Sequence, residues 1–223
     1  MKTIFRENKP FLIPYLVFLA IGGITLFLNE KGKLHLFFNH YHHPVADRIF
    51  EYITYLGDGV TVLIATIMAL FVRYRYAILI GGANFISALI TQGLKQLVFN
   101  DVSRPSKFFE GVKDIYFVPG VEMHSSYSFP SGHTTAAFTL YLCLALLTHN
   151  KWLKSFLFIL SLAIGFSRVY LSQHFFNDIY AGSLIGVTIS LTMFYIIENS
   201  RRFNDQKWLD RALFSRKIPH TNK

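Results

Sequence analysis

A twelve-residue stretch between two apolar segments decides how this sequence is read: Ser167-Arg-Val-Tyr-Leu-Ser-Gln-His-Phe-Phe-Asn-Asp178. It combines the guanidinium of Arg168, the imidazole of His174 and the carboxylate of Asp178. His174 and Asp178 are four residues apart, so a helix would place them on one face. There the carboxylate fixes the tautomer of the imidazole and raises its basicity, while the planar donors of Arg168 suit a phosphate. The stretch therefore indicates a histidine nucleophile that attacks a phosphoryl group.

The composition around this stretch is that of a membrane protein. Hydrophobic residues make up 52% of the 223 residues and charged residues only 16%, which is too apolar for an ordinary soluble domain. The net charge of +9 favours an anionic partner, but the basic residues form no continuous stripe, which argues against nucleic acid. The single cysteine, Cys143, lies in an apolar run and is expected to be a buried, unreactive thiol.

We expect an all-α integral membrane protein, a bundle of six transmembrane helices that forms one domain over residues 1–223. The first apolar segment lacks a small-residue cleavage site after it, so we interpret it as an uncleaved span rather than a signal peptide. The six expected spans are Phe11–Leu28, Ile49–Val72, Ala77–Leu94, Ser131–Thr148, Trp152–Leu171 and Asp178–Ile197.

Lysine and arginine are distributed unevenly between the two ends of such a bundle. The segments on the side of the termini hold 14 of the 22 basic residues and 4 acidic ones, against 8 basic and 9 acidic residues on the other side. By the positive-inside rule, both termini and the basic tail 198–223 should be cytoplasmic. The 35-residue loop from Gln96 to Pro130 then faces the periplasm or exterior, and its length without clear periodicity favours a functional role.

This topology brings the ionisable residues to one membrane depth on the outer side. They are Lys95 at the end of the third span, Arg104 in the outer loop, Arg168, His174 and Asp178. Pro130-Ser131-Gly132-His133 begins the fourth span at the same level. Ionisable groups beside membrane spans are costly and usually functional. The start of a helix also offers free N–H groups to a phosphate, with His133 placed to protonate a leaving group.

Three motifs resemble those of the phosphatidic acid phosphatase type 2 and vanadium haloperoxidase superfamily. Ser167-Arg168, His174 and Asp178 match its third motif in spacing, and Pro130–His133 match its second. In the first motif six residues separate Lys from Arg-Pro, whereas here eight separate Lys95 from Arg104-Pro105, and Lys107 is the alternative lysine. The resemblance covers about residues 90–195.

The resemblance implies a phosphatase that needs no metal or other cofactor. His174 would attack phosphorus, Asp178 would orient it, and His133 would protonate the leaving oxygen. The phosphate would be bound by the residues that remain in the motifs, namely Lys95, Arg104, Ser131, Gly132 and Arg168. The cations would neutralise the charge on the phosphate oxygens, so the same roles follow from the residues themselves.

We therefore expect hydrolysis of a phosphate monoester or pyrophosphate on a membrane lipid, at the outer face of a bacterial inner membrane. The family acts on undecaprenyl pyrophosphate, lipid A, phosphatidylglycerol phosphate and phosphatidic acid. The first alternative is a lipid phosphotransferase that uses the same histidine. A vanadium haloperoxidase and a non-enzymatic membrane protein are less favoured, since neither accounts for six spans together with converging cations.

Other polar residues have less definite interpretations. Asp58, between Gly57 and Gly59 inside the second span, either supports the site or bonds to neighbouring helices. The histidines between residues 29 and 48 lack a cysteine or paired carboxylates at metal-ligand spacing, so a hydrated interfacial loop is favoured over a metal site; they are His35, His40, His42 and His43. His124 is expected to lie away from the substrate.

Overall fold

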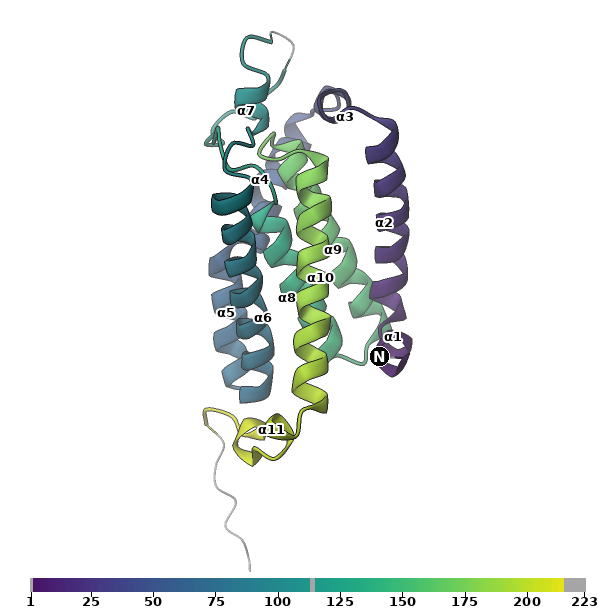
Figure 1. Ribbon diagram of the computed structural model, residues 1–223, viewed down its shortest axis with the longest axis vertical. Coiled ribbons are helices and arrows are strands. Elements are labelled where there is room, and N and C mark those ends of the chain that lie inside the picture. Colours follow the sequence, from purple (N-terminus) through teal and green to yellow (C-terminus); the bar gives the residue numbers. More distant parts are fainter. Residues whose placement is uncertain (1, 113–114, 215–223) are drawn as a thin grey trace, which may run out of the picture.

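The computed structural model describes residues 2–112 and 115–214, and every regular element within these ranges is a helix. The long helices run parallel to the long axis of the molecule (Figure 1). In chain order the elements are α1 (Lys2–Glu7), α2 (Lys9–Leu28), α3 (Lys31–His40), α4 (Pro44–Ile53), η1 (Thr54–Gly57), α5 (Gly59–Leu70), α6 (Tyr74–Gly93), η2 (Leu94–Val98), α7 (Pro105–Phe108), α8 (Gly132–Leu147), α9 (Lys151–Tyr170), α10 (Phe176–Asn199), α11 (Arg201–Asn204) and η3 (Lys207–Asp210).

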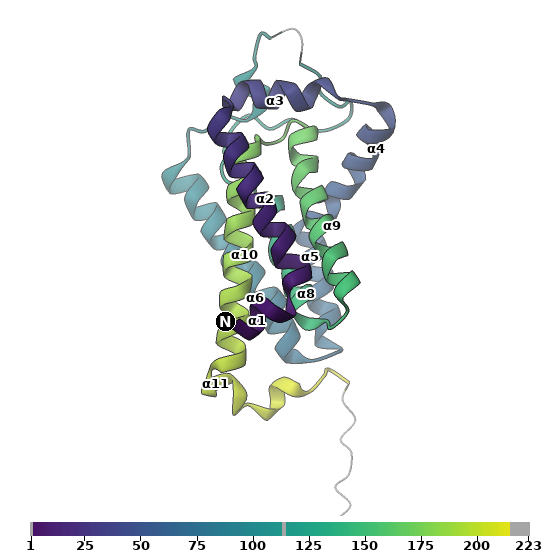
Figure 2. The same cartoon turned by 90° about the vertical axis from the view of Figure 1, so that its right-hand side faces the viewer.

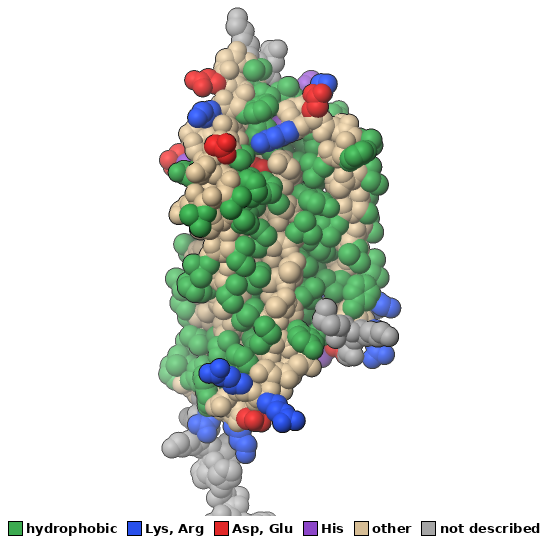
Figure 3. Space-filling model, in the orientation of Figure 1, with side chains coloured by type: hydrophobic (Ala, Val, Ile, Leu, Met, Phe, Trp, Pro, Cys, Tyr) green, Lys and Arg blue, Asp and Glu red, His purple; other side chains and the backbone are tan. Residues whose placement is uncertain are grey.

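Among the described residues, four helices are long and apolar enough to cross a membrane: α2, α6 with η2, α9 and α10. The pair α4–η1 and α5 makes a fifth span if its two parts are taken together. Helix α8 is apolar but has only 16 residues, so length and composition support four or five spans and do not confirm six. Charged side chains gather at the two ends of the molecule, with apolar side chains between them (Figure 3). Phe27 on α2 is 89% exposed, as expected of a surface that faces lipid.

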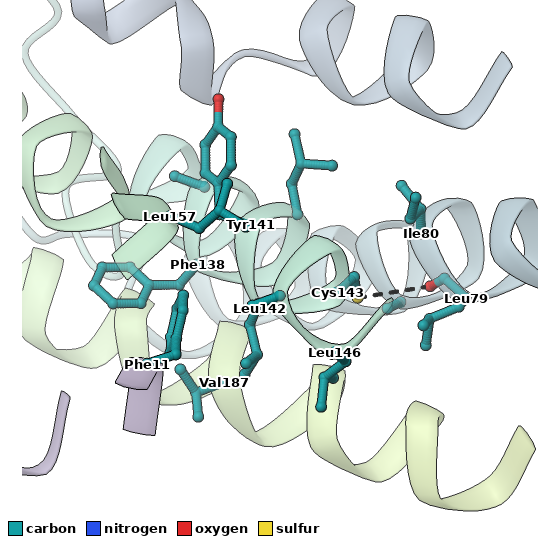
Figure 4. Close-up of a cluster of buried hydrophobic side chains, with 14 of the residues drawn as sticks. Phe11, Leu79, Ile80, Phe138, Tyr141, Leu142, Cys143, Leu146, Leu157 and Val187 are labelled. Atoms are coloured by element: carbon teal, nitrogen blue, oxygen red, sulfur yellow. Dashed lines mark hydrogen bonds between the residues drawn. The ribbon is translucent and has the colours of Figure 1, made fainter. Parts of the chain in front are cut away.

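Helix α8 lies at the centre of the bundle and packs against α6, α9 and α10. Its side chains are mostly small or apolar, so it can be buried on nearly every side. Figure 4 shows the resulting core around Leu142 and Cys143, with the Cys143 thiol 3.9 Å from the carbonyl oxygen of Leu79. Cys143 is fully buried, as the sequence predicted. The central helix carries Ser131, Gly132 and His133 at its N-terminal end.

Two glycines let α10 approach α8 closely. A Cβ on Gly182 would lie 2.7 Å from the carbonyl oxygen of Ser131, and one on Gly186 would lie 2.7 Å from that of Thr135. Any side chain larger than hydrogen would push the helices apart at both positions. The glycines therefore set the distance between the start of α8 and the start of α10, the two places where the motif residues His133 and Asp178 lie.

The expected continuous span Ile49–Val72 is wrong in its geometry, because the structure breaks it at Asp58. The pieces α4–η1 and α5 meet at a bend of 49°. Asp58 has extended backbone and caps α5 by accepting a hydrogen bond from the Gly59 N–H at 2.6 Å. A Cβ on Gly57 would lie 3.0 Å from the carbonyl oxygen of His133. The break thus brings η1 against the start of α8.

The segment 29–48 contains helix α3 (Lys31–His40), which lies across the top of the bundle (Figure 2), and the start of α4 at Pro44. The expectation of a hydrated loop is wrong for His35, which is 1% exposed and lies 3.1 Å from the hydroxyl of Ser172 through its Nε2. Asn39 on the same helix donates to Tyr116 O at 2.7 Å and accepts from Tyr116 N at 2.9 Å. At the opposite end, the part of the tail after residue 214 lies outside the described residues.

Candidate active site

The turn between α9 and α10 carries His174, and the backbone of Arg168 holds it in place. The N–H groups of Gln173 and His174 both donate to the carbonyl oxygen of Arg168, at 2.9 and 3.0 Å. Ser172 adopts a positive φ of 51°, which reverses the chain after the last turn of α9. The turn therefore keeps the side chain of His174 beside the C-terminal end of α9, where Arg168 lies.

His174 and Asp178 form the expected pair. Nδ1 of His174 lies 3.2 Å from Oδ2 of Asp178, and both side chains are buried. Burial lowers the pKa of His174 to about 3, Asp178 opposes this change, and the cations Arg104 and Arg168 reinforce it. The imidazole is therefore neutral at physiological pH. With its Nδ1 proton directed at Asp178, it presents an unprotonated Nε2, as a nucleophile requires.

Asp178 also joins His174 to the segment before α8. Its Oδ2 accepts hydrogen bonds from the Ser128 hydroxyl at 2.5 Å and from the Phe175 N–H at 3.0 Å. Its backbone carbonyl accepts from the N–H of Ser131 at 3.0 Å. These contacts fix the carboxylate before any substrate binds, and they connect the second and third sequence motifs directly.

Arg168 projects from the last turn of α9 and is 7% exposed. Its Nη1 donates to the hydroxyl of Thr54 in η1 at 2.7 Å, while its Nε is buried without a hydrogen-bond partner among the described residues. A buried guanidinium with unused donors suits an incoming anion, since unpaired buried donors are costly.

Arg104 comes from the long loop before α8, and its side chain contacts the turn between α9 and α10 that carries His174. Its Nε donates to the carbonyl oxygen of Ser126 at 2.9 Å, and its Nη1 donates to that of Gln173 at 3.2 Å. Burial lowers the pKa of Arg104 from its usual value, with Asp178 acting in the opposite direction. The loop thus supplies a second guanidinium next to His174.

Lys95 lies in the π-helical turn η2, which extends α6 by five residues. Such turns often occur at functional sites. Lys95 lines a cavity of about 660 Å³ together with Arg104, Gln92 and His124; this is the outer cavity. The longer spacing in the first motif therefore still brings Lys95 beside Arg104. The alternative Lys107 is exposed and does not line this cavity. His124, which was expected to lie away from the substrate, is part of its wall.

The residues at the start of α8 are arranged around the helix N-terminus. Ser131 caps the helix by accepting from the Thr134 N–H at 3.4 Å and from the Thr134 hydroxyl at 2.9 Å. The N–H groups of Gly132 and His133 follow in the first turn, where helices bind anions. Gly132 and His133 line a second cavity of about 230 Å³, the inner cavity, with Asp58 on its other wall.

Several supporting side chains were not identified from the sequence. Ser128 and Gln173 lie close to motif residues in the sequence, and this closeness was the one signal that could have identified them as part of the site. Thr54 gave no signal, because it lies in an apolar span far along the chain from Arg168. His35 was predicted to lie in a hydrated connector, and Asn39 was not singled out. Both nevertheless contact Ser172 in the turn between α9 and α10 that carries His174.

The chain is similar to known membrane-lipid phosphatases. The chain is 29% identical to a lipid A 4'-phosphatase of Porphyromonas gingivalis over 78% of this chain and 76% of that protein. It is also 29% identical to the undecaprenyl-diphosphatase BcrC of Bacillus subtilis, covering 86% of this chain and 88% of the relative. The crystal structure of Aquifex aeolicus LpxE matches with a TM-score of 0.63 at 26% identity, over 73% of this chain and 93% of that one.

The sequence also matches a family model over most of its second half and part of its first. The matched region, residues 75–202, contains all three motifs. It begins with α6, and it ends in the short helix after α10. This match confirms the resemblance drawn from the motifs, and it shows that the chain belongs to the PAP2 superfamily.

Proposed function

We propose that the protein hydrolyses a phosphate monoester or pyrophosphate on a membrane lipid through a phosphohistidine at His174. The protein is a phosphatase of the PAP2 superfamily, and its relatives are named lipid phosphatases. The observation that carries the histidine mechanism is the buried pair of His174 and Asp178 with two guanidinium groups beside it. The two guanidinium groups disfavour a protonated, positively charged His174, so the histidine stays neutral and can act as a nucleophile.

The proposed reaction has two steps. Nε2 of His174 forms a bond to phosphorus as the bond from phosphorus to the leaving oxygen breaks, and His133 gives that oxygen a proton. In the second step His133 takes a proton from water, whose oxygen attacks the phosphohistidine and releases inorganic phosphate and free His174. Lys95, Arg104, Arg168 and the first N–H groups of α8 bind the phosphate oxygens, with the Ser131 hydroxyl as a further donor.

The membrane setting of the proposal follows from charge and topology. The protein is an all-helical integral membrane protein. We place the active site at the outer face of a bacterial inner membrane, with six spans, cytoplasmic termini and one domain over residues 1–223. The distribution of lysine and arginine supports this orientation. The fourth span is the short one, and there Ser131 and Thr148 extend the 16 helical residues of α8 towards the usual length of about 20.

The substrate class is a phosphorylated lipid of the kind named for the relatives, lipid A or undecaprenyl pyrophosphate. The alternative is transfer of the phosphoryl group from His174 to a lipid hydroxyl instead of water. Both reactions share the first step, so the fate of the phosphoryl group distinguishes them. Transfer needs an acceptor lipid and releases less free phosphate than hydrolysis does.

The test is phosphate release from a panel of lipid phosphates by detergent-purified protein, with a chelator present throughout. Wild type should release phosphate, whereas His174→Ala should lose activity by several orders of magnitude because the nucleophile is absent. A ³²P-labelled lipid should also leave acid-labile label on wild type but not on the variant. Equal release by both proteins would overturn the role of His174. Loss of wild-type activity in the chelator would contradict the metal-independent mechanism.

A further inference from the structure

We propose that the inner cavity is a subsite for the polar part of the leaving group, and that it selects phosphate monoesters of hydroxyl-bearing lipids over lipid diphosphates. This inference rests on the proposed function, because it takes His133 as the proton donor to the leaving oxygen. The relatives named above include enzymes for both kinds of lipid, so their names do not decide between them. The chemistry of the cavity wall does.

Three neighbouring cavities share lining residues and lie one after another. Gln92 lines both the outer cavity and the inner cavity. Gly59, Asn84, Ala88 and Ala136 line both the inner cavity and an apolar groove of about 340 Å³ between α5 and α6. The series therefore runs from cationic, through polar, to apolar surroundings. A phosphorylated lipid has its phosphate, linking group and chains in the same order.

The inner cavity offers hydrogen-bond acceptors without a fixed positive charge. Asp58 lines it and uses one carboxylate oxygen to cap α5, and its other oxygen has no hydrogen-bond partner in the described part of the chain. Asn84 also lines it, donates its amide nitrogen to the carbonyl oxygen of Ile80 at 2.9 Å, and leaves its side-chain oxygen buried and unpaired. The described lining contains neither lysine nor arginine.

These acceptors suit hydroxyl groups and oppose a second phosphate. A sugar or glycerol hydroxyl would donate to Asp58 and satisfy the free oxygen of Asn84. A lipid diphosphate transfers its terminal phosphate and leaves a lipid monophosphate, whose oxygens would instead place more negative charge beside the Asp58 carboxylate, in surroundings that screen charge poorly. The volume of about 230 Å³ is several times the ~30 Å³ of one water in the liquid, so a group of glycerol or single-sugar size fits.

The test compares three lipids that differ in the group next to the scissile bond. They are a monophosphorylated, acylated glucosamine lipid, which bears hydroxyls, phosphatidic acid, which has none there, and farnesyl diphosphate. The full-length protein is assayed as wild type, Asp58→Asn and Asn84→Leu. Asparagine also caps helices well, so the first variant keeps the start of α5. Asp101→Asn removes an exposed carboxylate outside the cavity and is the matched control.

For wild type we expect kcat/KM to fall at least tenfold from the glucosamine lipid to farnesyl diphosphate, with phosphatidic acid between them. Asp58→Asn should reduce this difference at least threefold, mainly by raising diphosphate turnover. Asn84→Leu should lower turnover of the glucosamine lipid relative to phosphatidic acid, and Asp101→Asn should change neither ratio.

Two results would overturn the subsite while leaving the phosphatase function intact. One is a wild type that prefers the diphosphate, with substrate ratios unchanged by either cavity variant. The other is an equal loss on all three lipids in Asp58→Asn, which would show that Asp58 acts on the reaction itself. Absence of phosphate release from every lipid by wild type would contradict the proposed function, and the subsite with it.

Discussion

At the scale of single residues, Arg168 depends on a side chain from a different span. Its hydrogen bond to Thr54 is 2.7 Å long and buried, and it fixes the direction of the guanidinium. Thr54→Val keeps the shape but removes the acceptor, so kcat/KM for phosphate release should fall about tenfold, as expected for loss of a hydrogen bond to a charged group worth ~1.5 kcal/mol. Thr54→Ser should retain most of the activity. A fully active valine variant would contradict this positioning role.

Asp178 acts on His174 through orientation and charge, so its replacement should be less severe than loss of the nucleophile. In Asp178→Asn the amide accepts poorly from Nδ1–H, and the imidazole is free to adopt the other tautomer. We expect kcat to fall by two or more orders of magnitude, yet to stay measurably above that of His174→Ala. Single-turnover measurement of phosphohistidine formation would show the slowed step. Equal activities for the two variants would mean that Asp178 has a chemical role of its own.

The sequence was sufficient to bring the candidate reacting groups together, because their spacings match the family motifs. The four-residue spacing predicted the pair of His174 and Asp178, although His174 lies in the turn before α10 and not in the helix itself. The partners Thr54 and Asn39 were not predictable, because they meet the site across more than a hundred residues of chain or from a separate helix. Such contacts depend on how the helices pack, which no local pattern in the sequence records.

At the scale of elements, the closeness of α8 and α10 determines the geometry of the site. Gly186→Ala would place a methyl group 2.7 Å from the backbone oxygen of Thr135, forcing the helices apart and separating His133 from Asp178. We expect a lower melting temperature and a larger loss in kcat than in KM. Gly93→Ala is the matched control, since a Cβ there meets no atom within 4 Å and alanine favours helix. Similar behaviour of both variants would argue against this packing role.

The helices themselves were predicted to within a few residues wherever long apolar runs are flanked by charge, as in α9 and α10. The break at Asp58 was not predicted, since hydropathy averages over the Gly57-Asp58-Gly59 step and reports one continuous span. Its cause is local: the Asp58 side chain caps a new helix, and Gly57 fits against the backbone of His133. The same break creates the wall of the inner cavity.

At the scale of the whole molecule, stability should fall as the pH is lowered. Burial lowers the pKa of His35 to about 4 from the ordinary 6.5, with Asp178 opposing and Lys31 reinforcing the change. Between these values the unfolded chain binds a proton that the folded protein does not, so acid favours unfolding. The melting temperature of wild type should therefore decrease as pH falls from about 6.5 to 4. His35→Gln should decrease less over this range, and an unchanged slope would contradict the assignment.

The orientation of the molecule decides whether the site meets lipids of the outer or the inner leaflet. Cys143 is fully buried, so single cysteines placed at exposed positions can be labelled against a low background. We expect a membrane-impermeant maleimide to label Glu110→Cys in intact cells, because the proposed topology places the loop that carries Arg104 on the outer side. Arg6→Cys and Lys207→Cys should label only after permeabilisation, since an even number of spans with inward basic ends puts both termini in the cytoplasm. Labelling of position 110 only after permeabilisation would place the site on the cytoplasmic face. Labelling of just one terminus in intact cells would require an odd number of spans, and the short helix α8 would then be the first candidate for a helix that does not cross.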